Sequence, residues 1–152
     1  MRATVLLIAV VLLGLMAGLF YAYAGSVMPG LRRAEDRTVV DAMQRINIAI
    51  QNPLFLVIFL GALVAGVVAM FLYRDEPAVG WPLLIAVLLY AATLLITFTR
   101  SIPLNNRLAA GDLSDAREIR EFFLEPWIRW NTVRTLTSTG AFLASVWAQQ
   151  QQ

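Results

Sequence analysis

Long apolar runs without a single charge dominate this sequence, and they restrict the chain to a membrane protein. Three of them cover residues 3–24, 53–73 and 81–99. A helix needs about 20 apolar residues to cross the hydrocarbon core of a bilayer, and each run reaches that length. Because a spanning segment must satisfy its own backbone polar groups, we expect each run to be a transmembrane helix.

A fourth stretch, residues 132–148, is more polar because it contains Arg134 and several hydroxyl side chains. It crosses the bilayer only if its polar beginning lies among the lipid headgroups or faces the other helices. On that condition we expect one integral membrane domain over residues 1–152, all-α and folded as a four-helix transmembrane bundle.

The first run has a second interpretation as a cleaved signal peptide. Arg2 precedes it, and Ala22-Tyr23-Ala24 has the small residues of a cleavage site. However, the apolar part of a signal peptide is about 7–15 residues long, shorter than this run. We therefore favour a retained span.

Two long connections, residues 28–52 and 100–131, have apolar residues at helical spacing. These are Val39, Val40, Met43, Ile46 and Ile50 in the first connection, and Ile119, Phe122 and Phe123 in the second. We expect amphipathic helices there, lying on the membrane surface or capping the bundle.

Prolines mark the expected helix starts. Asn52-Pro53 is an N-cap residue followed by proline at the first helical position. Pro82 and Pro126 are expected to begin the third and fourth spans in the same way. Residues 74–77 form a polar turn between the second and third spans.

The arginines predict the orientation in the cell membrane. Four spans place Arg2 and Arg74 at one end and all other arginines at the opposite end. The positive-inside rule then puts the two long connections in the cytoplasm and both termini outside.

Several functions are excluded by composition. The chain has no cysteine and no histidine, which removes disulfides, thiol or imidazole catalysis, haem ligation by those residues, and the usual zinc and copper ligands. We expect no cofactor, although a hard cation bound by carboxylates stays formally open. The net charge of +2 gives no sign of a nucleic-acid partner. The spans contain no Asp or Glu, which argues against an ion-coupled carrier.

The two halves of the chain share an order of features. Each has a span, a proline (Pro29 or Pro103), an amphipathic stretch, and then an Arg-apolar-Asn triplet, at 45–47 and 129–131. This order predicts two tandem two-span repeats related by an axis along the membrane normal. The triplet is short, so coincidence stays open.

Polar side chains gather at the cytoplasmic end of the spans. They are Trp127, Asn131, Arg134 and Ser138 on one face of the fourth, Thr93, Thr97 and Arg100 on the third, Gln44, Asn47 and Gln51 before the second, Tyr21 and Tyr23 on the first, and Asn105, Asn106 and Arg107 after Pro103. Either they satisfy one another while the arginines bind lipid phosphates, or they form a polar binding site.

Several motifs resemble the membrane family that includes the anthrone oxygenases, from about Gly18 to Ala144. They are Tyr21-Ala-Tyr23-Ala-Gly-Ser-Val-Met-Pro29, Met43-Gln-Arg-Ile-Asn47, Asn52-Pro53-x-Phe55, Pro103-Leu-Asn105-Asn106-Arg107-Leu and Trp127-x-x-Trp130-Asn131-x-x-Arg134. The Pro-Leu-Asn and Trp-Asn-x-x-Arg motifs are the more specific ones.

The resemblance implies oxidation of an anthrone to an anthraquinone by dioxygen, without metal or flavin. It implies an enolate oxygen that accepts hydrogen bonds from Asn131 and Asn47, as in an oxyanion site. The charge would be stabilised by Arg134 or Arg107, and the rings would stack on Trp130 or Trp127. The base would be Tyr23, unless the substrate ionises by itself.

Three functions follow. The first is a cofactor-independent oxygenase, or related oxidoreductase, for a hydrophobic phenolic substrate, with dioxygen and membrane lipids as its other partners. Its catalytic residues would be Asn131, Arg134, Asn47 and Tyr23, and its substrate-binding residues Trp127, Trp130, Arg107, Asn105, Asn106, Arg100 and Tyr21. The second is a non-enzymatic accessory or lipid-binding protein, and the third a small transporter. An enzyme requires a pocket with convergent Asn and Arg donors, whereas a scaffold does not.

Overall fold

A computed structural model describes residues 1–152 as helices joined by short turns, which confirms the all-α prediction. The longer helices are α1 (Arg2–Ala22), α3 (Asp36–Ala49), α4 (Pro53–Leu72), α5 (Pro77–Ile96) and α7 (Ala116–Gln150). The shorter elements are the π-helix η1 (Tyr23–Val27), α2 (Met28–Leu31), the π-helix η2 (Thr97–Ser101), α6 (Ile102–Ala109) and the 3₁₀-helix η3 (Leu113–Asp115).

Three helical stretches are long and apolar enough to cross a membrane. They are Arg2–Leu31, Pro53–Leu72 and Pro77–Ala109, and they contain nearly all of the first three predicted spans. α7 does not reach the same apolarity, because charges crowd its first half and hydroxyl groups its second. The three apolar stretches indicate a membrane protein.

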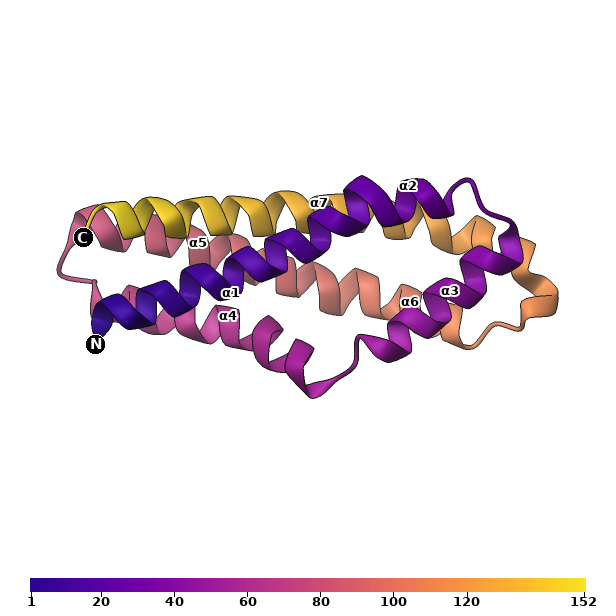
Figure 1. The fold of residues 1–152 in the computed structure, drawn as a ribbon, viewed down its shortest axis with the longest axis horizontal. Coiled ribbons are helices and arrows are strands. Elements are labelled where there is room, and N and C mark those ends of the chain that lie inside the picture. Colours follow the sequence, from indigo (N-terminus) through magenta and orange to yellow (C-terminus); the bar gives the residue numbers. More distant parts are fainter.

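The long helices run side by side along the molecule (Figure 1). α1 packs against α4 and α7, and α5 packs against the same two helices. Figure 1 shows both termini at one end, together with the turn between α4 and α5. α3 and the loops around it lie toward the other end, which we call the cap end.

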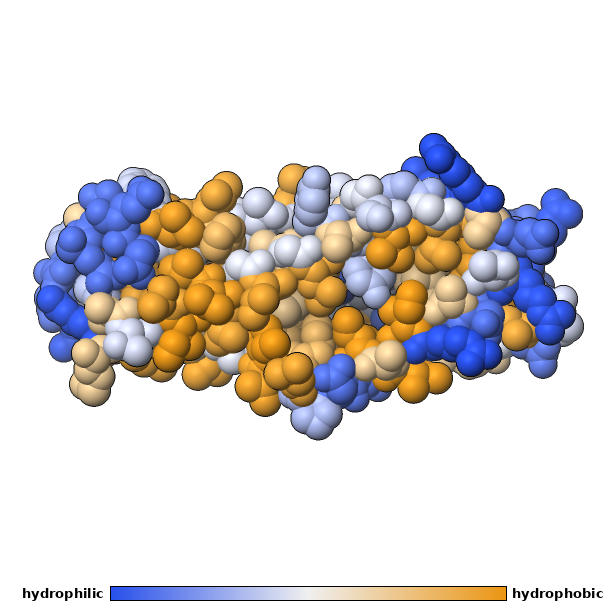
Figure 2. Space-filling model, in the orientation of Figure 1, coloured by the Kyte–Doolittle hydropathy of each residue, from blue (hydrophilic) through white to orange (hydrophobic).

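The surface has the polarity of a membrane protein. Figure 2 shows hydrophobic residues along the middle of the long axis and hydrophilic residues concentrated at both ends. Apolar side chains point outward from the long helices, among them Leu7, Val11, Val57, Val64, Leu88 and Leu95. Such exposure is unfavourable in water and neutral in lipid.

The predicted amphipathic face of α3 caps the bundle. Val39, Val40 and Met43 are fully buried in a cluster that also contains Ile119 and Phe123 of α7. These three residues of α3 therefore face other helices, whereas Ile48 near the end of α3 is 74% exposed.

Asn52 and Pro53 begin α4 as predicted. The Asn52 side chain accepts a hydrogen bond from the Phe55 backbone N–H at 2.9 Å, and Pro53 is the first helical residue. The polar turn at residues 74–77 is also confirmed.

Two expected helix starts are wrong. α5 begins at Pro77 and not at residue 81, so Pro82 lies inside it, because Val79 and Leu83 on both sides of Pro82 are buried in one cluster. α7 begins at Ala116 and continues through Pro126.

The amphipathic segment predicted in the second connection is consequently not a separate helix. It is the first part of α7. Phe123 precedes Pro126 and Trp127 follows it, and both belong to the same buried cluster. A helix break at Pro126 would separate them, so packing outweighs the hydrogen bond that proline cannot donate.

Both halves contain a π-helical turn shortly before a proline. The N–H groups of Met28 and Ile102 donate to carbonyls five residues earlier, and Pro29 and Pro103 follow them directly. Proline cannot donate to the carbonyl four residues back and crowds it, and such a π-turn accommodates this. The shared turns agree with the tandem order, whereas the duplication itself stays a prediction.

Candidate functional site

A cavity of about 370 Å³ lies among α1, α3, α4, α7 and the segment from η2 to α6. Its volume is within the range of small-molecule sites, about 300–1,000 Å³. Apolar side chains form most of its wall, including four phenylalanines, Phe20, Phe55, Phe59 and Phe98. Its polar lining comes from Tyr23, Asn47, Gln51, Thr97, Ser101, Asn105, Asn106, Trp127, Asn131 and Arg134, and it contains no Asp or Glu.

Arg134 places a positive charge in the wall of this cavity. The side chain is buried, and its guanidinium lies 4.6 Å from the ring centre of Phe20 and 5.5 Å from that of Trp127. No carboxylate pairs with it. Because a buried cation without a counter-charge is costly, the cavity suits an anionic or strongly accepting oxygen.

Asn131 holds Arg134 in position. Its Oδ1 accepts a hydrogen bond from Arg134 Nη2 at 3.1 Å, and its Nδ2 donates to the Phe20 carbonyl at 3.2 Å. The amide therefore connects α7 to α1. One of its two amide hydrogens remains for another acceptor.

Three buried polar atoms around the cavity have no hydrogen-bond partner. They are Nε of Arg134, Nδ2 of Asn47 and Oγ of Ser101, and elsewhere in the chain only Oε1 of Gln149 shares this state. A buried polar atom without a partner costs about 1–3 kcal/mol. Their concentration around one cavity indicates a binding site whose ligand satisfies them.

Trp127 and Tyr23 form one side of the cavity. Their ring centres are 5.5 Å apart at a tilt of 49°. The Trp127 indole Nε1 donates to Asn105 Oδ1 at 3.0 Å, which fixes the indole plane. Together they provide a rigid aromatic surface beside the guanidinium.

The structure thus brings seven of the predicted site residues together and leaves four outside. Around the cavity are Tyr23, Asn47, Asn105, Asn106, Trp127, Asn131 and Arg134. Arg100 lies over Trp130, with its guanidinium 5.2 Å from the ring centre, and Arg107 lies over Phe122 at 4.3 Å. Tyr21 is 67% exposed. None of Arg100, Arg107, Trp130 and Tyr21 lines the cavity.

Sequence reasoning missed Ser101 and the phenylalanine wall. Ser101 follows Arg100 at the end of an apolar run, and its spacing of four from Thr97 was the one available signal. The π-helical turn η2, which contains both residues, could not be read from that spacing.

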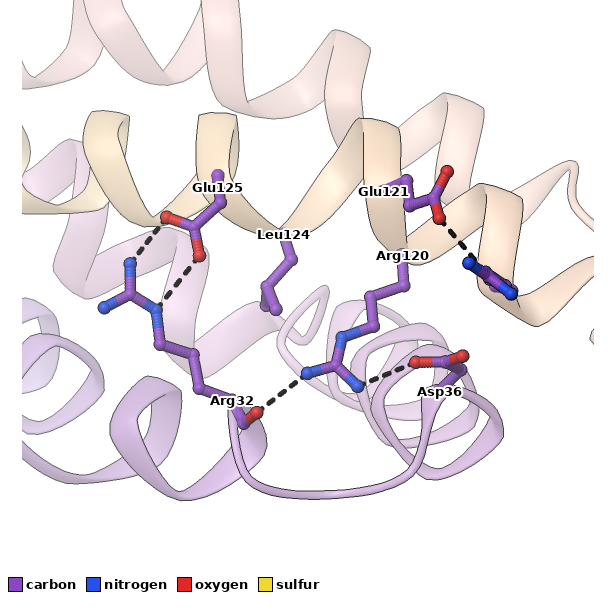
Figure 3. Close-up of a pocket in the computed structure, with 7 residues that line it drawn as sticks. Arg32, Asp36, Arg120, Glu121, Leu124 and Glu125 are labelled. Carbon is purple, nitrogen blue, oxygen red and sulfur yellow. Dashed lines mark hydrogen bonds and ion pairs between the residues drawn. The ribbon is translucent and has the colours of Figure 1, made fainter.

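A second group of charges at the cap end is fully paired (Figure 3). Arg120 Nη1 donates to Asp36 Oδ1 at 2.7 Å and to the Ala34 carbonyl at 2.8 Å, and its Nη2 donates to the Arg32 carbonyl at 2.7 Å. Arg32 in turn pairs with Glu125. These contacts clamp the loop before α3 onto α7. No group of three or more acidic side chains could hold a metal ion.

Comparison with known protein families gave a match over most of the second part of the chain. The sequence model of the family described as anthrone oxygenase matches residues 51–144, more than half of the chain. No curated protein and no solved structure matches significantly. The matched region includes Ser101, Asn131 and Arg134, whereas Tyr23 and Asn47 precede it.

Proposed function

The chain belongs to the anthrone oxygenase family, and from this premise we propose that it is a cofactor-independent oxygenase of the membrane. Its substrate is a hydrophobic aromatic compound that ionises to an enolate or phenolate. The observation that carries the proposal is the buried guanidinium of Arg134, which has no carboxylate partner and lies in a largely apolar cavity. Three polar atoms around that cavity, one of them Nε of Arg134 itself, have no hydrogen-bond partner.

The reaction needs only the substrate, dioxygen and a proton acceptor. A ring methylene loses a proton, and the resulting enolate gives one electron to dioxygen. The carbon radical and superoxide then combine to form a C–O bond, and after protonation the hydroperoxide loses water to leave a carbonyl. Overall, one anthrone and one dioxygen give one anthraquinone and one water.

Several polar and aromatic residues of the cavity have roles in this scheme. Arg134 stabilises the enolate oxygen, where charge develops in an environment with little water. Asn131 orients Arg134, and Asn47 and Ser101 bind a second oxygen of the substrate. Trp127 supports the rings, with Asn105 fixing its plane, and Asn106 lines the same cavity. When the substrate does not ionise by itself, Tyr23 accepts the proton in its phenolate form.

In the membrane, we propose that the second half of α7 forms a fourth span, with Arg134 turned into the cavity. The termini then lie outside and the cap end in the cytoplasm, where most arginines are. The exposed residues Arg100, Arg107 and Tyr21, and the partly buried Trp130 beside Arg100, contact lipid headgroups there. The site lies at the boundary between membrane and cytoplasm.

A non-enzymatic lipid-binding or accessory role is the alternative. It is favoured by an apolar groove beside the cavity, which has the character of a site for an acyl chain. An activity measurement separates the two functions.

The test is oxygen uptake by detergent-purified protein supplied with an anthrone. The double variant Asn131→Leu, Arg134→Leu is compared with Arg129→Leu, which removes an exposed arginine from the same helix. We expect uptake and quinone formation by the parent and by Arg129→Leu, and loss in the double variant with its helical content retained. Uptake at the uncatalysed rate by all three proteins would reject the oxygenase and favour the lipid-binding role.

A further inference from the structure

A groove on the outer surface lies directly beside the cavity. Residues of α1, α3 and the start of α4 form this outer groove, whose volume is about 530 Å³. Asn52 is the one lining residue that is not hydrophobic. Figure 2 shows the surface hollowed near the middle of this face, among hydrophobic residues, and Figure 1 places α1, α3 and α4 around that area.

The outer groove and the cavity share part of their walls. Leu19, Tyr23, Ile46, Ile50 and Phe55 line both spaces. One layer of side chains therefore separates the outer surface from the buried site, and the end of α3 and the start of α4, on either side of the helix break at residues 50–52, supply most of that layer.

With the apolar stretches embedded in the bilayer as proposed, the outer groove opens toward the hydrocarbon and not toward water. On its rim, Leu15 is 53% exposed and Leu54 is 71% exposed. Both belong to helical stretches apolar enough to span a membrane. At the cap end, by contrast, Arg120 and its partners present paired charges at the surface. An apolar compound dissolved in the bilayer thus meets the outer groove first.

We propose that the outer groove is the portal through which the substrate leaves the bilayer, and that it holds an extended apolar chain of the substrate while the oxygen-bearing ring lies beside Arg134. This inference rests on the proposed function. It narrows the substrate class to lipid-soluble phenols or enols that carry such a chain. The two spaces match the two parts of that ligand, since the cavity holds the polar donors and the outer groove holds almost none.

The test uses two non-reacting ligands with the protein in lipid nanodiscs. One is a hydroxynaphthoquinone, whose acidic hydroxyl gives an anion that stands in for the enolate, and the other is the same ring with an undecyl chain. Quenching of tryptophan fluorescence reports binding, because Trp127 lines the cavity. Dissociation constants are expressed relative to the ligand dissolved in the bilayer.

Ala49→Phe fills the outer groove, because Ala49 is exposed and lines that groove but not the cavity. Ala22→Phe is the matched control, since Ala22 is exposed on α1 and lines neither space. We expect Ala49→Phe to raise the dissociation constant of the chain-bearing ligand about tenfold through lost packing contacts. The ligand without a chain should bind unchanged, and Ala22→Phe should alter neither.

Three outcomes overturn the inference. One is an equal effect of Ala49→Phe on both ligands. Another is no effect on either, as expected if a bilayer acyl chain fills the outer groove. The third is binding of neither ligand to the parent.

Arg134→Leu keeps this test distinct from the proposed function. If it weakens both ligands while Ala49→Phe changes nothing, the anion site stands and the portal fails. If Ala49→Phe selectively weakens the chain-bearing ligand and Arg134→Leu changes nothing, the portal stands and the proposed site fails. Thermal unfolding of each variant confirms that it is folded.

Discussion

Two arginines about four turns apart on α7 have opposite surroundings. Arg120 donates three hydrogen bonds to Asp36 and two backbone carbonyls, all supplied by the chain itself. Arg134 is buried, has one hydrogen bond, to Asn131, and keeps an unpartnered Nε. The hydrogen-bond donors of Arg120 hold the fold together, whereas those of Arg134 remain available to a ligand. The contrast shows that an arginine's role is read from its partners and not from its place on a helix.

The largest expected effect is on activity when Arg134 is removed. Arg134→Leu should lower the rate of anthrone oxidation about 100-fold or more, comparable to the loss of an oxyanion donor. Its thermal unfolding midpoint should change little, because removal of a buried unpaired charge offsets the loss of the partner of Asn131 Oδ1. Oxygen uptake and circular dichroism measure the two quantities. A large fall in the midpoint would show that Arg134 is a structural residue like Arg120.

Arg120→Leu should give the reverse pattern. Loss of its hydrogen bonds and ion pair should reduce the free energy of unfolding by about 1–3 kcal/mol, a modest value because the pair is partly exposed. The turnover of the folded fraction should not change. Denaturant titration in detergent, combined with oxygen uptake per folded molecule, checks both. An activity loss without destabilisation would place Arg120 in the function.

Ser101→Ala tests the same contrast between free and paired polar groups on a single hydroxyl group. Ser101 Oγ has no partner, so its removal should leave stability unchanged and weaken binding of the hydroxynaphthoquinone anion about fivefold, the effect of one hydrogen bond. Ser145→Ala is the control, since the Ser145 hydroxyl donates to the Phe142 carbonyl at 2.7 Å and does not line the cavity. It should change stability slightly and binding not at all. Equal binding by all three proteins would remove Ser101 from the site.

The smallest expected effect is on the pH dependence of stability, through the carboxyl group of Asp112. The backbone N–H of Ser114 donates to Asp112 and holds the pKa of that carboxyl below its ordinary value. Because the folded protein has the lower pKa, the contribution to stability is complete above the ordinary aspartate pKa. It is lost as the pH falls through the folded value. Asp112→Asn should flatten this part of the stability–pH curve. An unchanged curve would show that the Asp112 cap contributes nothing measurable.

Much of the site could be found from helical spacing within one segment. Trp127, Asn131 and Arg134 recur at intervals of four and three, so any regular helix places them on one face. Asn47 shares the helix of Val40 and Met43, whose burial the apolar pattern predicted. Trp130, three residues from Trp127, looked equivalent by residue type but lies on the neighbouring face beside Arg100.

The sequence alone was sufficient to predict features that depend on residues close together in the chain. The apolar runs require helices because lipid offers no hydrogen bonds to the backbone. Asn52 and Pro53 begin α4 because an amide side chain and a missing N–H suit a helix start.

Long-range packing decided the rest. Pro126 lies within α7 because Phe123 and Trp127 pack into one cluster with α3, a partner distant in sequence. Ser101 faces the cavity from a π-helical turn, and Arg134 lacks a carboxylate because none of the neighbouring helices brings one to it. Whether a hydrogen-bond donor has a partner depends on atoms of other segments. Only the tertiary structure shows which of those atoms lie close enough to it.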